Sequence, residues 1–284
     1  MAEIRSENPA PLLSSDELLR LCEYLYRLSG ISYDESKRFY IERRVAERIA
    51  QTSSTSFNSY MALLRSGSGE AEHLINIFTV NETYFYREDH QLRCLTHDIL
   101  PEIVRSKLPG DLVRIWCVPC STGEEPYSVA IWLLENWPLV DAYHIDIVGS
   151  DIDTRVLAAA KQGRYGERAL SKLPAALHNE YFSPSYGGRR EIIADLRESV
   201  TFTQVNLLDA GGVSAQGPFD VIFCRNVLIY FDDASRLAAV NNLSNALHSH
   251  GFICLGHSES MSRISLEFSA RRFKDAIVYQ RPGA

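Results

Sequence analysis

The hydrophobic positions in the first eighty residues recur at helical spacing. Ser14 and Glu17 form a capping box, and the leucines that follow make one apolar stripe that ends at Gly30. Further segments repeat an apolar residue every three or four positions, and these are 34–51, 56–64 and 71–80. We therefore predict a small all-helical domain over residues 1–82.

The pattern changes in the rest of the chain, residues 83–284. Helical stretches alternate with short apolar runs of strand length, and the runs are 113–118, 144–153, 200–208, 219–230 and 251–258. Strands that alternate with helices indicate a mainly parallel sheet covered by helices, which is an α/β fold. The stretch 164–200 fits neither pattern and carries a Tyr186-Gly187-Gly188 turn signal, so we expect a small antiparallel β insertion there.

Polar clusters stand at the ends of the predicted strands. They occur at 121–125, 150–153, Asn206 and 225–226. Parallel sheets bind ligands at the carboxyl ends of their strands. The clusters are therefore expected to lie together in one ligand site.

Composition narrows the classes of function. The 284 residues are 45% hydrophobic and 23% charged, and the net charge of −7 argues against a general nucleic-acid binder. No apolar run approaches the roughly 18 residues that span a bilayer, so we expect a cytoplasmic protein with no direct membrane insertion. The six cysteines are scattered through apolar segments, which favours free thiols over a disulfide framework.

The segment RIWCVPCSTGEEPYS, residues 114–128, is compatible with several kinds of site. Cys117 and Cys120 have the spacing of a redox pair, but Cys117 falls within a predicted strand rather than at an exposed helix start. A zinc site needs a second pair of ligands, which the sequence does not offer at suitable spacing, so we expect no metal. A phosphate loop would carry a lysine, whereas two glutamates repel anions. Core packing is the expected role of both cysteines.

The two glutamates of this segment favour a ligand that is cationic or rich in hydroxyl and amine donors. A carboxylate in the SDID segment, residues 150–153, could accept hydrogen bonds from a ribose, as in sheets that bind dinucleotides. S-adenosylmethionine carries a ribose, an ammonium and a sulfonium, and so it meets both requirements.

Five motifs together resemble one known family. NETYFYRE (81–88), STGEEPYS (121–128), SDID (150–153), VNLL (205–208) and FCRNVLIYF (223–231) have the order and spacing of the CheR-type chemoreceptor methyltransferases. The resemblance runs from Leu18 to Gln280. It implies a class I methyltransferase domain, which is Rossmann-like, over residues 83–284. It also implies methylation of receptor glutamates in sensory adaptation, with S-adenosylmethionine as cofactor and S-adenosylhomocysteine as product.

The resemblance assigns roles to individual residues. Asp151 is expected to accept the ribose hydroxyls, and Glu125 to help bind the cationic end of the cofactor. Arg87 could pair with a carboxylate of the cofactor or the substrate, and Tyr230 is a candidate wall for the transferred methyl group. The full set of expected cofactor contacts is Asn81, Thr83, Arg87, Glu125, Asp151, Asn206, Leu207, Asn226 and Val227.

The expected chemistry demands little of the protein. Asn206 and Leu207 would flank the adenine, while Asn226 and Val227 would lie near the methyl group. A glutamate has an ordinary pKa of about 4.3, so the nucleophile is already ionised at neutral pH and needs no strong base. Catalysis would then come from alignment of the reacting atoms and from removal of water.

Receptor binding is predicted from two segments. Lys37, Arg44 and Arg48 share one face of the second helix, where they could dock the acidic, helical cytoplasmic signalling region of a chemoreceptor. In the family, the β insertion of some members binds a receptor tail peptide as an added strand. The loop after Ser183 is short here, so we expect no tail-peptide tether.

Two other interpretations remain open. A methyltransferase of the same fold could act on nucleic acid or a small molecule, although 225–230 lacks the Pro-Pro-Tyr type segment common in amino-methylating DNA enzymes. A non-catalytic signalling adaptor could also keep the fold without turnover.

Overall fold

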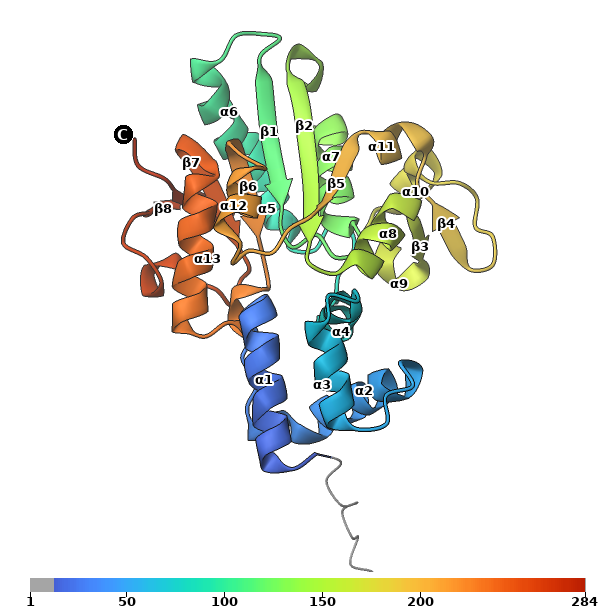
Figure 1. Ribbon diagram of the computed structural model, residues 1–284. Coiled ribbons are helices and arrows are strands. Elements are labelled where there is room, and N and C mark those ends of the chain that lie inside the picture. The colour runs from blue at the N-terminus through green and yellow to red at the C-terminus, as the bar shows by residue number, and fades with distance from the viewer. Residues whose placement is uncertain (1–12, 284) are drawn as a thin grey trace, which may run out of the picture. The chain divides into compact units, whose positions relative to one another are not determined.

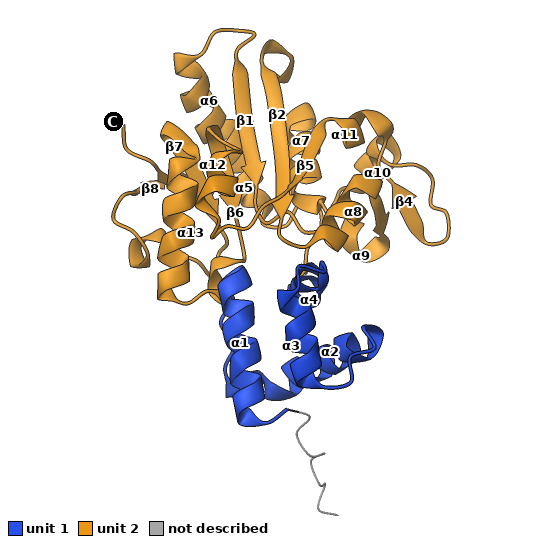
Figure 2. Ribbon diagram, in the orientation of Figure 1, with its two compact units in different colours: residues 1–79 blue, residues 80–284 orange. Residues whose placement is uncertain are grey.

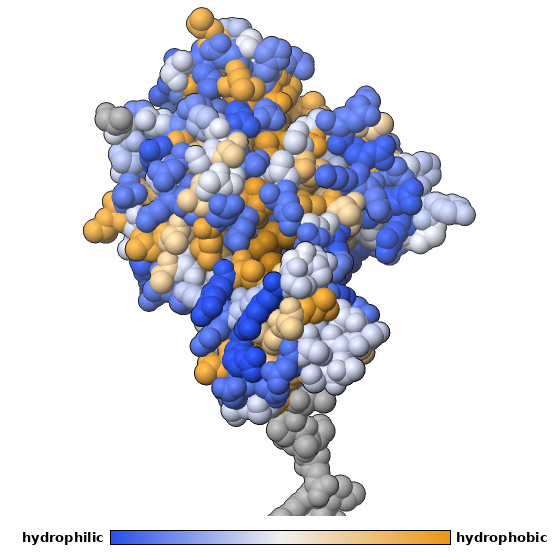
Figure 3. Space-filling model, in the orientation of Figure 1, coloured by the Kyte–Doolittle hydropathy of each residue, from blue (hydrophilic) through white to orange (hydrophobic). Residues whose placement is uncertain are grey.

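The computed structural model describes residues 13–283 (Figure 1). The chain divides into two compact units, residues 1–79 and 80–284, and each has its own hydrophobic core (Figure 2). On the face shown in Figure 3, hydrophilic and hydrophobic side chains are interspersed over both units. Among the described residues, no helix has the length and apolar character that crossing a bilayer demands.

The first unit is helical, as its sequence pattern predicts. Its elements are α1 (Ser15–Ser29), η1 (Glu35–Lys37), α2 (Arg38–Gln51), α3 (Phe57–Arg65) and α4 (Glu70–Phe78). The capping box of Ser14 and Glu17 is present at the start of α1. The apolar faces of these helices enclose a core that includes Leu21, Leu25, Ile41, Tyr60 and Leu74.

The second unit is built on a seven-stranded sheet with the order β5-β2-β1-β6-β7-β9-β8. Its parallel strands are β1 (Leu112–Cys117), β2 (His144–Asp151), β5 (Val200–Gln204), β6 (Phe219–Cys224) and β7 (Leu247–Leu255). Two antiparallel strands, β9 (Ile277–Gln280) and β8 (Ser269–Arg272), extend the sheet beyond β7. The predicted α/β fold with a mainly parallel sheet is confirmed, whereas the apolar pattern does not predict β8 and β9.

The connections between the strands are largely helical, and several of them pack against the sheet (Figure 1). Before β1 lie α5 (Asp89–Cys94) and α6 (Leu100–Ile103), and the strands that follow are connected through α7 (Glu124–Asn136), α8 (Thr154–Gln162), α12 (Ala210–Ser214) and α13 (Asp233–Asn245). The π-helical segment η2 (Leu95–Ile99) joins α5 to α6, and short 3₁₀ turns lie at η3 (Val104–Ser106), η4 (Val140–Ala142), η5 (Leu228–Tyr230) and η6 (Met261–Arg263). Because β1 stands between β2 and β6, the strand order reverses at the carboxyl end of β1, where open α/β sheets bind ligands.

The five predicted strands all end earlier than their apolar runs, and two of them bear directly on the site. The run 144–153 forms β2 only as far as Asp151, because Asp153 instead caps α8 by accepting backbone N–H groups. The run 219–230 forms β6 only to Cys224, and a loop and the turn η5 follow. These early ends place the polar residues of both segments in loops at the carboxyl edge of the sheet.

The insertion contains the small antiparallel sheet that its turn signal predicts. β3 (Arg164–Gly166) pairs with β4 (Arg189–Glu191), and the helices α9 (Glu167–Leu170), α10 (Ala175–Tyr181) and α11 (Ala194–Glu198) complete the segment. The turn at its tip carries Tyr186, whose side chain is 92% exposed.

Candidate functional site

The loop after β1 turns the chain from the sheet into α7. Gly123 lies in this loop with φ +91, and a Cβ there would stand 2.9 Å from Ala160 and 3.2 Å from Phe202. Only glycine fits this conformation and this close approach. The start of α7 is therefore held tightly against α8 and β5. This places Glu125, in the first turn of α7, at the carboxyl edge of the sheet.

Glu125 forms a buried ion pair with Arg225, which follows β6. Nη1 of Arg225 lies 2.6 Å from Oε2 of Glu125, and the two side chains are 3% and 14% exposed. Burial raises the pKa of Glu125, and the charge of Arg225 opposes that rise. The second oxygen, Oε1, is buried and accepts no hydrogen bond from any residue that the structure describes. Glu125 thus offers an unused anionic acceptor that fits a cationic donor.

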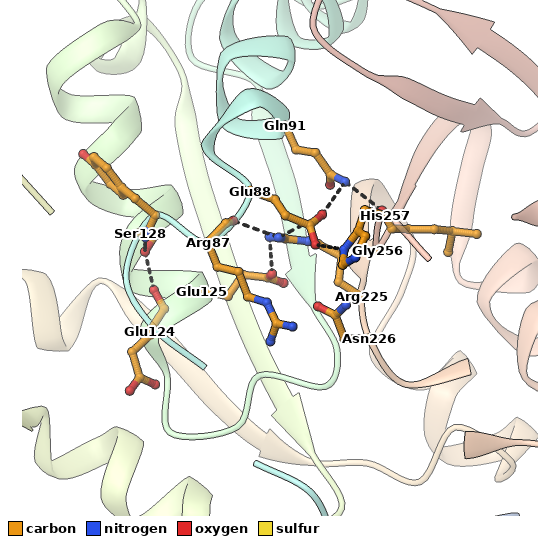
Figure 4. A network of polar contacts seen from close by, with 12 residues as sticks. Arg87, Glu88, Gln91, Glu124, Glu125, Ser128, Arg225, Asn226, Gly256 and His257 are labelled. Atoms are coloured by element: carbon orange, nitrogen blue, oxygen red, sulfur yellow. Dashed lines mark hydrogen bonds and ion pairs between the residues drawn. The ribbon is translucent and has the colours of Figure 1, made fainter. Parts of the chain in front are cut away.

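A chain of polar contacts continues from Arg225 toward the surface (Figure 4). Its Nη2 lies 3.3 Å from Oε2 of Glu88 and donates to the backbone oxygen of Arg87 at 2.8 Å. Glu88 also contacts Nδ1 of the exposed His257 at 3.0 Å and accepts from the side-chain amide of Gln91 at 3.2 Å. Arg225 is therefore fixed from both sides, and it presents Glu125 in one orientation.

Asp151 ends β2 and is buried. Its Oδ2 accepts the backbone N–H of Ser121 at 2.8 Å, and its Oδ1 accepts that of Asp153 at 3.0 Å. Burial raises the pKa of Asp151 to about 6, and these backbone hydrogen bonds hold it lower than burial alone would. The contact with Ser121 ties the end of β2 to the loop after β1, beside Glu125.

The segment 81–87 lies in the same unit and reaches the same edge of the sheet. Nδ2 of Asn81 donates to Oδ2 of Asp153 at 3.1 Å, and Ser121 donates from its hydroxyl to the backbone oxygen of Asn81 at 3.4 Å. Thr83 and Arg87 are half-buried. The guanidinium of Arg87 donates to the backbone oxygen of Glu82 at 2.6 Å, and it forms no ion pair with any carboxylate among residues 13–283.

The loop after β5 carries Asn206 and Leu207. The Oδ1 of Asn206 accepts the backbone N–H of Leu208 at 3.0 Å, which forms a local turn. Leu207 is buried, and its backbone oxygen accepts the side-chain amide of Asn242 at 2.9 Å. The loop is thereby anchored to α13.

The loop after β6 carries Asn226 and Val227, and Tyr230 follows in η5. The backbone N–H groups of Asn226 and Val227 donate to the carboxylate of Glu259 at 2.8 and 3.0 Å. All three predicted residues are half-buried. Each of the nine expected cofactor contacts thus lies in the second unit, at the carboxyl ends of its strands or in the segment 81–87.

The predicted docking residues lie in the first unit and differ in their surroundings. Lys37 is exposed, just before α2. The Arg44 guanidinium lies over the ring of Tyr40, 4.2 Å from its centroid. Arg48 is 14% exposed and forms a double hydrogen bond with the buried Glu70, from Nε at 2.8 Å and from Nη2 at 2.6 Å. The charge of Arg48 is therefore neutralised inside its own unit.

The cysteine pair that raised the question of a redox or zinc site is buried. Cys117 and Cys120 are free thiols and are 0% and 1% exposed. Burial raises the pKa of both thiols well above the usual value, so neither is a reactive thiolate. Among the described residues, no cluster of three potential ligands could hold a metal ion.

Sequence reasoning did not assign roles to three residues of this site. Arg225 and Glu88 lie within motifs that the sequence singles out, yet nothing in the pattern shows that they pair with each other. Glu259 lies far along the chain, and its contacts join positions more than thirty residues apart. The signal that could have found Arg225 is a cation at the end of a buried strand, because such a charge needs a partner.

Comparison with known proteins decides the family. The model for the all-alpha domain of CheR methyltransferases matches residues 16–79, and the model for their SAM-binding domain matches residues 81–277. The chain belongs to the CheR methyltransferase family. Like the family models, it joins an all-helical unit to a methyltransferase unit.

Named relatives of this CheR family member are similar over nearly their whole length. Chemotaxis protein methyltransferase 2 of Vibrio cholerae serotype O1 is 45% identical over 273 residues, which cover 95% of this chain and 94% of that protein. Chemotaxis protein methyltransferase 2 of Pseudomonas aeruginosa is 36% identical, covering 92% and 94%. The chemotaxis protein methyltransferase of Escherichia coli is 33% identical, covering 91% and 89%.

The residues present fit S-adenosylmethionine, the cofactor of CheR methyltransferases. The unused, buried Oε1 of Glu125 matches an ammonium group, and the carboxylate of Asp151 at the end of β2 matches ribose hydroxyls. The chain is therefore an S-adenosylmethionine-dependent methyltransferase of the chemotaxis family.

Proposed function

We propose that this chain methylates glutamate side chains of chemoreceptors. The observation that carries the proposal is Arg87, a cation beside Glu125 that forms no ion pair with any described carboxylate. A guanidinium at the carboxyl edge of the sheet is suited to bind a substrate carboxylate through bidentate hydrogen bonds. The family resemblance and the names of the chemotaxis relatives support the same substrate class.

Residues at the ends of different strands would bind different parts of the cofactor. We propose that Asp151 accepts the ribose hydroxyls, that Asn206 and Leu207 flank the adenine, and that Glu125 holds the ammonium group. Asn81 and Thr83 would complete the pocket from the segment that precedes α5, where Asn81 already contacts the cap of α8. Because Arg225 holds Glu125 from one side, the carboxylate does not have to reorganise when the cofactor binds.

Methyl transfer in this site would depend on alignment of the reacting atoms. S-adenosylmethionine supplies a methyl group that is already activated by a sulfonium. A substrate glutamate with a pKa of about 4.3 is ionised at neutral pH, so no residue of this chain has to remove a proton. Arg87 would aim one carboxylate oxygen at the methyl carbon, and Asn226, Val227 and Tyr230 would form the wall that keeps the approach in line. Near-attack placement at roughly 3 Å accounts for a large part of the rate in such a site.

Receptor docking by the first unit is part of the proposal. Lys37 and Arg44 are the candidates, since Lys37 is exposed and Arg44 is only half-buried. Arg48 contributes to the stability of its unit through Glu70 rather than through a free charge. An acidic helical segment of a receptor is the complementary surface.

Transfer of a labelled methyl group tests the proposal. The purified protein is incubated with labelled S-adenosylmethionine and either receptor-containing membranes or DNA. We expect label only in the receptor, and we expect alkali to release it as methanol, because methyl esters hydrolyse in base whereas methylated amines do not. Alkali-stable label, or label in DNA, would show that the substrate is another one. Cofactor binding with no transfer to either would favour a non-catalytic adaptor.

A further inference from the structure

The chain bends sharply after β6, and the bend carries residues that we place beside the methyl group. Asn226 has φ +59, a left-handed conformation that asparagine tolerates better than most side chains. Val227 follows with φ −125 and ψ −38, and η5 begins at Leu228. The backbone N–H groups of these three residues all donate to one side chain, as in the concave N–H clusters that bind anions.

The anion bound by this bend is the carboxylate of Glu259. Its Oε2 accepts the N–H groups of Asn226 and Gly256, each at 2.8 Å. Its Oε1 accepts those of Val227 at 3.0 Å and Leu228 at 2.7 Å. A carboxylate has about four acceptor positions, and four backbone bonds fill them. Glu259 therefore has no acceptor left for cofactor or substrate, and its contribution to the site comes through the bend.

Gly256 gives an independent sign that the bend is held closely. A Cβ at this position would lie 2.7 Å from Nδ2 of Asn226 and 2.8 Å from Oε2 of Glu259. The backbone nitrogen of Asn226 would be 3.0 Å away. The loop after β7 thus touches the loop after β6 with no room for a side chain between them, and one carboxylate joins the two loops.

We propose that Glu259 is the positioning residue that fixes the bend at 226–228 in the shape that methyl transfer requires. The inference rests on the proposed function in that the bend is taken to line the methyl group. The carboxylate sets the direction in which the side chains of Asn226 and Val227 leave the backbone. Without it, three N–H groups that now point at one acceptor would have to turn toward other partners. A reaction that depends on alignment loses on the order of 10²-fold in rate for a displacement of about 1 Å.

Glu259→Gln tests this role, because the amide has the same size but turns one oxygen into an NH2 group that faces two backbone donors. We expect the kcat of receptor methylation to fall at least about tenfold. We also expect weaker binding of S-adenosylhomocysteine, measured by calorimetry. Adenosine, which has only the adenine and ribose, should compete as well as it does with the wild type. Glu267→Gln, at an exposed residue of the same C-terminal region, is the matched control and should keep wild-type values.

Gly256→Ala is the second variant and decides the question if the glutamine variant does not fold. Its methyl group would clash with both the carboxylate of Glu259 and the backbone of Asn226, so it would displace the bend without removing the charge, and the same pattern of effects is expected. An unchanged kcat and affinity, or an equal loss of S-adenosylhomocysteine and adenosine binding, would overturn the proposal. If the wild type binds S-adenosylhomocysteine but methylates no receptor, the proposed substrate is wrong, and the comparison of the two ligands still tests Glu259.

Discussion

At the scale of single residues, the site consists of buried charges whose positions are set by backbone contacts. Glu125 has one oxygen bound by Arg225 and one unused, and Asp151 is held by two backbone N–H groups. A buried carboxylate is costly unless it is paired. A ligand with an ammonium group and hydroxyl donors would therefore stabilise the charged form of both carboxylates.

The pH dependence of cofactor binding follows from Asp151. Burial raises the pKa of this carboxyl to about 6, so it becomes protonated as the pH falls through that value and loses acceptor capacity. The affinity for S-adenosylhomocysteine should therefore be full well above pH 6, about half of that near pH 6, and roughly tenfold lower at about pH 5. Calorimetric titration across this range measures it.

Asp151→Asn is the control for that titration. It should weaken binding by about 1.5–3 kcal/mol, because a hydrogen bond to a charged group is lost, and it should make the affinity less dependent on pH. A wild-type affinity that stays constant across the range would contradict Asp151 as the ribose acceptor. So would a variant with the wild-type pH dependence.

The cysteine pair should be dispensable for the chemistry. Cys117 and Cys120 are buried thiols with a raised pKa, so replacing both with alanine should lower stability by about 1 kcal/mol each and leave methyl transfer close to the wild-type rate. Activity is measured with and without a chelator and at different redox potentials. Loss of activity with the chelator, or a change with redox potential, would mean that the pair has a functional role.

The sequence could predict the position of a candidate residue where that position follows from the element that carries it. Asp151 and Glu125 stand where strands of an α/β sheet end, and that position alone indicates a ligand site. Glu259 could not be predicted, because its role depends on the backbone path of a loop after a different strand. Arg48 could not be interpreted correctly from the sequence either. Its spacing suggests a charge on the surface, whereas it pairs with Glu70, which lies in another helix.

At the scale of elements, α2 combines a structural face with an exposed one. Arg48→Met should destabilise the first unit by about 3–5 kcal/mol, because it leaves the carboxylate of Glu70, which is 5% exposed, buried without its cation. Tyr60 would still donate to Glu70, but a single neutral hydrogen bond does not replace the ion pair. Urea unfolding followed by the helical signal measures the loss.

Lys37→Met is the matched variant at the other end of the predicted docking face. It should leave the unfolding curve unchanged, because Lys37 is exposed, and it should raise the KM for the receptor. If Arg48→Met proves as stable as the wild type, the buried ion pair is not structural, and Arg48 returns to the set of docking candidates.

The β insertion yields a prediction about receptor tethering. The turn at 186–188 folds β4 back along the segment before it, to which it is joined by isolated bridges, and leaves few residues to form a groove. A receptor tail peptide should therefore show no specific binding to the insertion. Calorimetric titration with a tail peptide measures this. Micromolar or tighter binding that depends on the edge of β4 would show that the tether is used.

The elements themselves were predictable where hydrophobic pattern decides them. The five parallel strands are largely buried and form apolar runs, so the sequence locates them, although each strand ends before its run does. β8 and β9 were not predicted because each has only four residues, and SARR is mostly polar. Their place in the sheet is set by pairing, of β9 with β7 and of β8 with β9, and not by their own periodicity.

At the scale of the whole molecule, each unit carries a distinct part of the proposed function. The second unit contains the proposed cofactor residues and the candidate groups for methyl transfer. The first unit contains the candidate docking charges, on an otherwise acidic protein of net charge −7. A methyltransferase that needs no general base can use its residues for binding and alignment, and this matches a site of fixed ion pairs and backbone-held loops.

Mass spectrometry of a receptor cytoplasmic fragment tests the central claim most directly. The fragment is incubated with the protein and S-adenosylmethionine, digested, and sequenced by fragmentation. We predict that specific glutamate side chains gain the mass of one methyl group in place of a hydrogen, and that Arg87→Ala and Asp151→Ala strongly reduce this gain. Methylation found on another residue type, or no methylation by a protein that binds the cofactor, would contradict the account.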